Sequence, residues 1–312
     1  MNKPFPIPVR AITDSPPIPA DNAAVREAGH SDDELSRVLE LPRTANAFLM
    51  PSVPHDATPE TLKAAADVLD TFYRWVKAWT FSRYAREVPR LDILPLPDDI
   101  KKVLNEVLGE GEVSARVEFK DHALPEWRNV YVQESVFPGL WRVREFNHEG
   151  TEIAHWVEAS SLPQALIDQA QHAARGDVPD LPMPEGVMNA PSLLNEIRAA
   201  LANVTENTAS RAINLTLLPL SPADYDALLA ALPMGVTAIV SRGFGSCRVT
   251  STGVKNVWRV RHFNQKDALI LNAIEVVFCP HVVLAAQEDI DDTKERLADL
   301  ISWMRECAQN PL

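Results

Sequence analysis

Two stretches of the chain alternate apolar and polar residues, and each stretch predicts a set of four β-strands. In both, β-branched and aromatic residues recur at alternate positions, and glycine or asparagine turns break the runs. The first set is predicted at Val113–Phe119, Asn129–Ser135, Leu140–Asn147 and Glu152–Ser160, and the second at Val236–Arg242, Ser246–Thr252, Val257–Asn264 and Ala268–Phe278. The short connections favour an antiparallel meander within each set.

Apolar residues spaced three or four positions apart predict helices around both sets. A long amphipathic helix is predicted from Thr58 to Pro89, with Phe72, Trp75 and Trp79 in the core. Another helix is predicted to begin at Ser192. Shorter helices are predicted at Pro97–Leu108, Pro163–Arg175, Pro222–Leu232 and Val283–Ala308. Antiparallel strands flanked by helices predict an α+β fold.

The two sets are copies of one another. The run Trp141-Arg142-Val143-Arg144-Glu145-Phe146-Asn147 returns 117 residues later as Trp258-Arg259-Val260-Arg261-His262-Phe263-Asn264, with six of seven residues identical. Leu94-Pro95-Leu96 returns after 124 residues as Leu218-Pro219-Leu220, which places seven extra residues of the first copy near Asp121–Arg128. This self-similarity indicates an internal duplication. We therefore expect two copies of a helix-flanked antiparallel sheet, related by pseudo-twofold symmetry.

Proline-rich segments mark the boundaries of the two copies. Six prolines within residues 1–20 exclude a helix or an interior strand there. Residues 1–57 are predicted to form an extended or disordered arm, with a short helix near Ser31–Leu39. The predicted division is an arm at 1–57, a first repeat at 58–178, a proline-rich linker at 179–191 and a second repeat at 192–312.

The composition favours a protein that binds another protein rather than nucleic acid. Of 312 residues, 46% are hydrophobic, and the net charge is −13. A nucleic-acid binder normally shows a basic patch, whereas an acidic chain attracts a basic partner. The apolar stretches are too short to span a membrane, and the first residues lack the apolar run of a signal peptide. We therefore expect no membrane insertion and a cytoplasmic location.

The residue types that bind metals do not cluster in the sequence, and we predict no cofactor. The chain has an odd number of cysteines and no C-x-x-C motif, which argues against a disulfide framework or a structural zinc site. These cysteines are Cys247, Cys279 and Cys307. Histidines of the first copy, such as His155, are replaced in the second, so a duplicated metal site is excluded. No G-x-S-x-G, H-E-x-x-H or Walker motif is present. We therefore predict neither an enzyme nor catalytic residues.

The repeated motif carries the candidate site. Successive strand residues point to opposite faces, so Trp141 and Val143 are predicted to face the core, as are their counterparts in the second copy. The candidate partner-binding residues share the other face: Arg142, Arg144, Phe146, Arg259, Arg261 and Phe263. Two interpretations stay open. In the first, the arginines form ion pairs with Glu158 and Glu275 on the next strands. In the second, the arginines and phenylalanines form a docking surface, since arginine and aromatic residues are enriched in interface hot spots.

The same motifs carry a family resemblance. The duplicated Trp-Arg-Val-Arg-x-Phe-Asn element, the Leu-Pro-Leu segments and the paired endings Glu158-x4-Pro163 and Glu275-x4-Pro280 resemble the HupH/HyaF family of hydrogenase expression and formation proteins, which includes HoxQ-like members. The resemblance covers about residues 48–308. It implies no established catalytic residues.

The resemblance implies an accessory chaperone in the maturation of an uptake nickel–iron hydrogenase. Such a protein is expected to bind the iron–sulfur small-subunit precursor before export by the twin-arginine route, alongside other maturation proteins. The alternatives are an iron–sulfur or other cofactor-handling assembly protein, and a non-catalytic scaffold of the maturation complex. Three unclustered cysteines argue against a cluster carrier, because clusters typically need four thiolates.

Overall fold

The computed structural model describes residues 53–54, 56–79, 84, 87–120, 127–243 and 245–309. All of them belong to one compact unit, Leu41–Leu312. Of the predicted arm at residues 1–57, all but residues 53–54 and 56–57 lie outside the described residues, and so does the predicted short helix near Ser31–Leu39.

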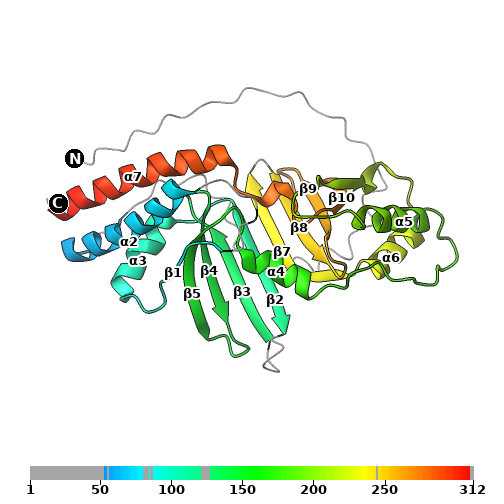
Figure 1. Cartoon of the computed structure of the whole chain (residues 1–312), viewed down its shortest axis with the longest axis horizontal. Coiled ribbons are helices and arrows are strands. Elements are labelled where there is room, and N and C mark those ends of the chain that lie inside the picture. Colours follow the sequence, from blue (N-terminus) through cyan, green and yellow to red (C-terminus); the bar gives the residue numbers. More distant parts are fainter. Residues whose placement is uncertain are drawn as a thin grey trace. The chain divides into compact units, whose positions relative to one another are not determined.

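Within the described residues, ten strands form one antiparallel sheet (Figure 1). The first copy contributes β1 (Arg90–Asp92), β2 (Val113–Lys120), β3 (Trp127–Glu134), β4 (Leu140–Phe146) and β5 (Glu152–Ala159). The second contributes β6 (Arg211–Asn214), β7 (Met234–Gly243), β8 (Gly245–Thr252), β9 (Val257–Phe263) and β10 (Leu269–Val276). The eight predicted strands and both meanders are confirmed, and β1 and β6 add one strand to each copy.

The two predicted sheets are in fact one sheet. The strand order is β1-β5-β4-β3-β2-β7-β8-β9-β10-β6, and β2 joins the copies by pairing antiparallel with β7. A meander by itself leaves the backbone groups of its edge strand unpaired, and pairing β2 with β7 satisfies both edges at once. The extra residues of the first copy fall in the β2–β3 hairpin, whose connection at 121–126 is longer than the single residue between β7 and β8.

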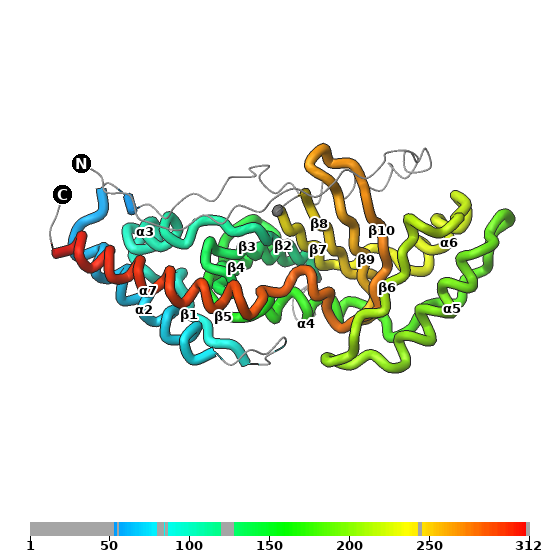
Figure 2. The backbone as a smooth tube through the Cα atoms, turned by 90° about the horizontal axis from the view of Figure 1, so that it is seen from above, coloured from blue at the N-terminus to red at the C-terminus, as the bar shows by residue number. Residues whose placement is uncertain are grey.

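Helices gather at both ends of the sheet. Helices α2 (Pro59–Ala78), α3 (Asp98–Leu108) and α7 (Gln287–Gln309) share one core beside β5, and α2 and α7 run side by side (Figure 2). At the other end lie α5 (Ala190–Leu201) and α6 (Pro222–Ala231), while α4 (Gln164–His172) packs on β2 and β7. Two short 3-10 helices, η3 (Leu215–Leu217) and η4 (His281–Val283), complete the set. The closing helix of the second copy thus packs on the first copy.

The first long helix ends earlier than predicted. It begins as expected, with the Thr58 hydroxyl accepting a hydrogen bond from the Thr61 amide, but it ends at Ala78 rather than continuing to Pro89. Trp79 leaves the helix in an extended conformation and contacts Gly139. Gly139 has a φ of +85°, which favours glycine, and a side chain there would collide with the Trp79 ring. This tertiary contact, which periodicity does not encode, sets the end of the helix.

The tryptophan face of the repeated motif forms the central core, as predicted. Trp141 and Trp258 are fully buried, and their indole N–H groups donate to equivalent carbonyls, those of Ser160 and Val277. Both copies contribute to this one cluster, together with Leu166 of α4. We call this side of the sheet the Trp face and the opposite side the Arg face. The burial of two tryptophans in one shared core ties the copies together.

The two asparagines that follow the motif form equivalent turns, as predicted. The side-chain oxygen of Asn147 accepts hydrogen bonds from the amides of Glu149 and Thr151. That of Asn264 accepts bonds from the amides two and four residues later in the same way. These Asx turns fix the hairpins β4–β5 and β9–β10 and therefore the register of the Arg face.

Candidate partner-binding face

The first copy presents arginine and aromatic side chains in a row across the Arg face. The backbone register places Arg144 beside Tyr131 on β3 and His155 on β5, and it places Tyr131 beside Arg116 on β2. The Arg116 guanidinium lies 5.6 Å from the centre of the Tyr131 ring. Cation–π contacts of this kind orient an arginine without removing its charge.

Arg144 and Phe146 form the accessible part of this row. The Arg144 side chain is 49% exposed, its Nε donates to Glu152 at 2.7 Å, and its guanidinium lies 5.0 Å from the centre of the Phe146 ring. Phe146 in turn packs edge-on against Tyr131, with ring centres 5.5 Å apart. Burial alone would raise the pKa of Glu152, but the hydrogen bond and the charge of Arg144, together with other nearby basic groups, lower it. A charged and aromatic surface of this kind suits contact with another protein.

Arg142 instead holds β4 and α3 together. Its Nη1 donates to the Asn105 side chain and its Nη2 to the Gly109 carbonyl, both at 2.9 Å. It therefore binds the C-terminal end of α3, where the helix dipole favours a cation. Burial lowers the pKa of Arg142.

In the second copy the equivalent residues are more deeply buried. Arg261 is 2% exposed and Phe263 is 4% exposed. The Phe263 ring lies between two arginines, with its centre 4.1 Å from the Arg248 guanidinium and 5.8 Å from that of Arg261. Arg248 also pairs with Asp267 at 2.8 Å. Of the six candidate residues, Arg144 is thus the most open to a partner and Arg261 the least.

The predicted ion pairs with Glu158 and Glu275 are wrong, because both glutamates lie on the Trp face. Register pairs Glu158 with Trp141 and Glu275 with Trp258, while the arginines face Val157 and Ile274. The Glu158 carboxylate accepts hydrogen bonds from the Trp156 indole and the Ser160 hydroxyl. A register difference of one residue moves a side chain to the other face, and the sequence does not specify that register.

Sequence reasoning missed Arg116, Tyr131 and His155, which lie outside the repeated motif. His155 is 6% exposed, with its Nδ1 3.3 Å from Glu152. Burial lowers the pKa of His155, although Glu152 opposes that effect. The alternation of apolar and polar residues along each strand predicts which of its own side chains share a face. Only the register across four strands places these side chains in one row.

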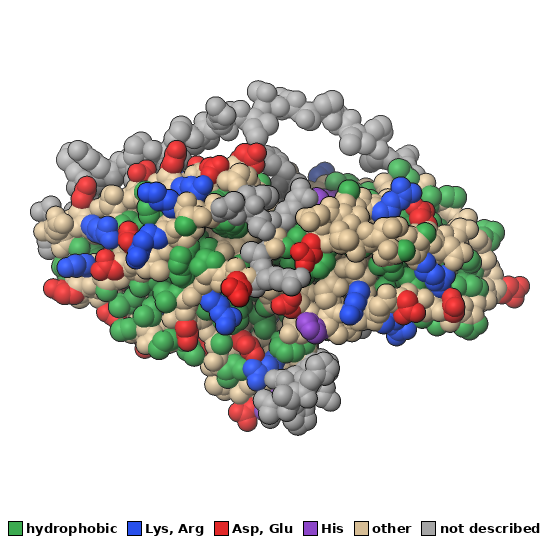
Figure 3. All heavy atoms as spheres, viewed as in Figure 1, with side chains coloured by type: hydrophobic (Ala, Val, Ile, Leu, Met, Phe, Trp, Pro, Cys, Tyr) green, Lys and Arg blue, Asp and Glu red, His purple; other side chains and the backbone are tan. Residues whose placement is uncertain are grey.

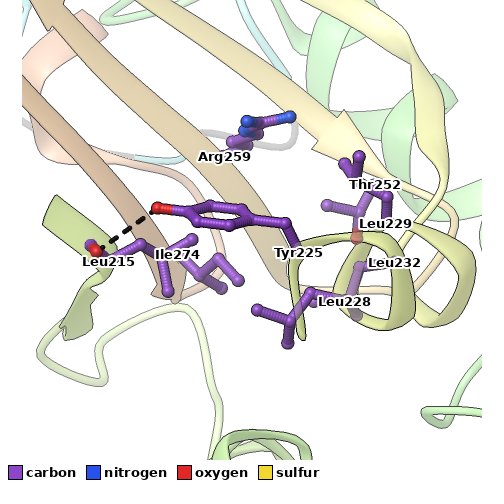
Figure 4. Close-up of a pocket in the computed structure, with 8 residues that line it drawn as sticks. All are labelled: Leu215, Tyr225, Leu228, Leu229, Leu232, Thr252, Arg259 and Ile274. Carbon is purple, nitrogen blue, oxygen red and sulfur yellow. Dashed lines mark hydrogen bonds between the residues drawn. The ribbon is translucent and has the colours of Figure 1, made fainter. Parts of the chain in front are cut away.

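A small pocket lies beside Arg259, between α6 and the sheet (Figure 4). On the side of the molecule shown in Figure 3, acidic and basic side chains are interspersed rather than gathered by sign. Within the part of the chain that the structure describes, no helix is both long and apolar enough to cross a membrane. Among the same residues, no group of three acidic, histidine or cysteine side chains is arranged to hold a metal ion.

The cysteines are placed as apolar residues. Cys247 and Cys279 are buried in the central core, as predicted. Burial, with a smaller effect of Glu275, raises the pKa of Cys247 to about 12 and that of Cys279 further. Neutral thiols are poor metal ligands.

These features define a class: an internally duplicated α+β protein whose two copies build one sheet and carry a repeated arginine motif on one face of it. The model of the HupH hydrogenase expression protein C-terminal conserved region matches the chain twice, at residues 62–177 and 187–304. The chain belongs to this family, as the resemblance predicted.

Named relatives are similar over most of the chain. The hydrogenase expression/formation protein HoxQ of Cupriavidus necator is 35% identical over 275 residues, which cover 88% of this chain and 93% of HoxQ. The hydrogenase-1 operon protein HyaF of Escherichia coli K12 is 35% identical over 223 residues, 71% of this chain and 75% of HyaF. A solved structure, the hydrogenase expression protein HupH from Thiobacillus denitrificans, is 30% identical over 36% of this chain and 95% of its own, with a TM-score of 0.35.

Proposed function

We propose that this chain is a non-catalytic accessory protein in the maturation of an uptake nickel–iron hydrogenase. In this role it binds the iron–sulfur small-subunit precursor as a chaperone, in the cytoplasm, before export by the twin-arginine route. The observation that carries the proposal is membership of a family described as hydrogenase expression proteins, with both copies matched. Other maturation proteins are further partners.

Charge and surface support this role. A precursor with a twin-arginine signal is basic at that segment, and a chain of net charge −13 attracts it at long range. Arg144, Phe146 and Tyr131 then offer a local contact surface on the Arg face. The remaining candidates, Arg142, Arg259, Arg261 and Phe263, contribute by holding that face in shape.

We also propose a pseudo-twofold axis between the copies, through the β2–β7 pair. Strand order is the same outward from this pair on both sides. Ala115 pairs with Ile239, its own counterpart at the offset of 124 residues that relates the Leu-Pro-Leu segments. A twofold axis requires such a self-equivalent pair. Superposition of the two copies tests the proposal, which fails if the best rotation is far from 180°.

The function is tested by co-expressing the tagged chain with the small-subunit precursor in a strain that lacks the chromosomal copy of this gene. We expect the precursor to be captured, and the captured amount to fall as salt is raised, since screening weakens long-range attraction. Arg144→Ala should reduce capture without a change in melting temperature. Arg74→Ala on α2, whose side chain is 67% exposed, is the matched control. Capture of the large-subunit precursor alone, or of neither subunit, would overturn the proposal.

The cofactor-handling alternative has a separate readout. The buried and neutral state of Cys247 and Cys279 favours a colourless protein. A brown protein with stoichiometric iron and sulfide, purified without a metal-binding tag, would replace the chaperone proposal with this alternative.

A further inference from the structure

The two copies carry different charges at one equivalent place on the Arg face. In the first copy this place holds Arg116, Glu118 and Tyr131, and the Arg116 guanidinium pairs with the Glu118 carboxylate at 2.8 Å. The offset between the copies is 124 residues before the extra segment of the first copy and 117 residues after it. These offsets give the counterparts Val240, Arg242 and Arg248. The set is therefore neutral in the first copy and carries two positive charges in the second.

The backbone register brings the two arginines of the second copy close together. Arg242 of β7 lies opposite Ser246 of β8, and Arg248 is two residues further along β8 on the same face. Such diagonal neighbours are about 7–8 Å apart. Arg248 also lies directly opposite Arg261 of β9. Like charges in such positions destabilise a sheet, so the second copy carries an electrostatic cost that the neutral set of the first copy avoids.

Two contacts hold Arg248 in place. Its Nη2 donates to the Asp267 carboxylate at 2.8 Å, and its guanidinium lies 4.1 Å from the centre of the Phe263 ring. The Arg248 side chain is mostly buried, whereas the Asp267 side chain is mostly exposed. Arg248 is therefore a preorganised cation, and little conformational freedom is lost when an anion approaches it.

Arg242 keeps most of its hydrogen-bonding capacity. Its Nη1 donates to the Ser114 hydroxyl at 3.2 Å, and among the residues that the structure describes no carboxylate forms an ion pair with it. A guanidinium has five N–H donors in a planar fork that matches a carboxylate. Burial lowers the pKa of Arg242; Glu110, which follows α3, opposes this effect, and Arg248 adds to it. Arg242 is thus a half-buried cation with donors to offer.

This pair of arginines lies where the two copies join. Arg242 belongs to the second copy and Ser114 to the first, on the paired strands β7 and β2. The register places Ser114 in line with Arg142, on the face that also presents Arg144. An anion bound by Arg242 would therefore lie on the same side of the sheet as the proposed contact surface.

We propose that Arg242 and Arg248 form an anion site that binds an acidic segment of a partner protein. One carboxylate pairs with the Arg242 guanidinium, and Arg248 attracts a second one while it stays bound to Asp267. Charge complementarity selects this occupant. The chain has a net charge of −13 and repels a nucleic acid with many phosphates, whereas a short acidic segment is attracted by the local cations. The inference does not depend on the partner being a hydrogenase subunit.

The test uses the full chain with isotope-labelled arginine side chains, titrated at constant ionic strength with the peptide acetyl-Gly-Ser-Asp-Asp-Ser-Gly-amide. We expect saturable shifts of the Nε–H signals of Arg242 and Arg248, and at least fivefold weaker binding of the peptide with Asn-Asn in place of Asp-Asp. Arg242→Gln should weaken binding of the Asp-Asp peptide at least fivefold and remove the difference between the two peptides. Arg211→Gln, on the exposed edge strand β6, is the matched control and should bind as the original chain does.

Two further substitutions test the charge requirement. Arg242→Glu restores the residue of the first copy and should abolish binding of the Asp-Asp peptide. Arg242→Lys keeps the positive charge and should keep the preference for Asp-Asp over Asn-Asn. Unchanged melting temperatures show that the variants are folded, and the comparison of the two peptides on the original chain needs no substitution.

Three outcomes would overturn the proposal. In the first, the shifts do not saturate, or Arg242→Gln binds both peptides as the original chain does. In the second, sulfate shifts the same signals at concentrations as low as the peptide does, which would identify a site for simple ions. In the third, light scattering shows a dimer that Arg242→Gln converts to a monomer, which would identify a second copy of this chain as the occupant.

Discussion

Arg142 and Arg144 stand two residues apart on the same strand face, yet their surroundings give them different roles. Arg142 satisfies the Asn105 side chain and a backbone carbonyl at the end of α3. Arg144 is half exposed and pairs with Glu152 near solvent. Hydrogen bonds made by a charged and largely buried group contribute more to stability than an exposed ion pair.

We expect Arg142→Ala to lower the free energy of unfolding by about 2 kcal/mol, because a carbonyl and an amide lose their charged donor. Arg144→Ala should lower it by less than about 1 kcal/mol. Urea denaturation of both variants measures the difference. Equal losses would contradict the separate roles assigned to the two arginines.

Glu134 is a buried carboxyl where the second copy has a hydroxyl. Its Oε2 accepts a hydrogen bond from the Val113 amide at 3.3 Å, as the Ser251 hydroxyl does from the Thr237 amide at 3.1 Å. Burial, with smaller effects of nearby Glu112 and Asp289, raises the pKa of Glu134 from 4.5 to about 8, although the Val113 hydrogen bond opposes this shift. The folded chain therefore favours the protonated form.

This shift predicts a pH-dependent stability. Because the folded pKa is raised, the contribution of Glu134 is complete below pH 4.5 and is lost as the pH rises through about 8. Glu134→Gln should be more stable than the original chain at pH 9, by on the order of 3 kcal/mol, and should flatten the dependence between pH 5 and 8. Urea denaturation across this range is the measurement. Glu149→Gln, in an exposed turn, is the control and should not change the slope.

At the scale of elements, one aspartate holds α5 and α6 together. Asp224, in the first turn of α6, forms a capping box with Ser221. Its other oxygen accepts hydrogen bonds from the backbone amides of Met188, Asn189 and Ala190 at the start of α5. Burial alone would raise the pKa of Asp224, but these backbone hydrogen bonds lower it well below its usual range. The same side chain therefore caps one helix and positions the next.

We expect Asp224→Ala to destabilise the fold by roughly 2 kcal/mol, because several amides lose their acceptor. The folded pKa is lowered, so the contribution of Asp224 is present above the unfolded pKa and is lost only as the pH falls into the strongly acidic range. Thermal denaturation at neutral pH measures the loss. Asp226→Ala, two positions after Asp224 on the same helix, should cost much less.

At the scale of the whole molecule, the two copies are one cooperative structure. They share the sheet through β2 and β7, and Trp141 and Trp258 lie in the same central core. Helix α4 of the first copy covers β7 of the second, where the Thr237 hydroxyl donates to the Leu166 carbonyl. Helix α7 of the second copy packs on α2 of the first. Neither copy retains its full core without the other.

We therefore expect a cavity at the junction to weaken both copies equally. Ile239 of β7 is fully buried, and Ile239→Ala should cost about 3 kcal/mol. Hydrogen exchange of amides in β4 and in β9 should accelerate by the same factor. The exposed substitution Val282→Ala is the control. Faster exchange confined to β9 would show that the copies unfold separately.

Local pattern was sufficient for most of the elements of this protein. Alternation in the strands, proline and threonine at helix starts, and asparagine in the turns act between residues close in sequence, so the sequence alone predicts eight strands and the buried Trp face. The repeated motif likewise predicts the duplication and the family, because identity at a fixed offset needs no knowledge of contacts. The six candidate residues were correctly grouped on one face by the two-residue period of a strand.

The tertiary structure decided what depends on contacts distant in sequence. Pairing of β2 with β7 merged two predicted sheets into one, and packing of Trp79 on Gly139 ended α2 before Pro89. Register between strands moved Glu158 and Glu275 away from the arginines and brought Arg116, Tyr131 and His155 beside Arg144. A one-residue change of register exchanges the faces of a strand while leaving its own alternation unchanged. For that reason the sequence determined which residues share a strand face, and only the fold determined which residues they meet there.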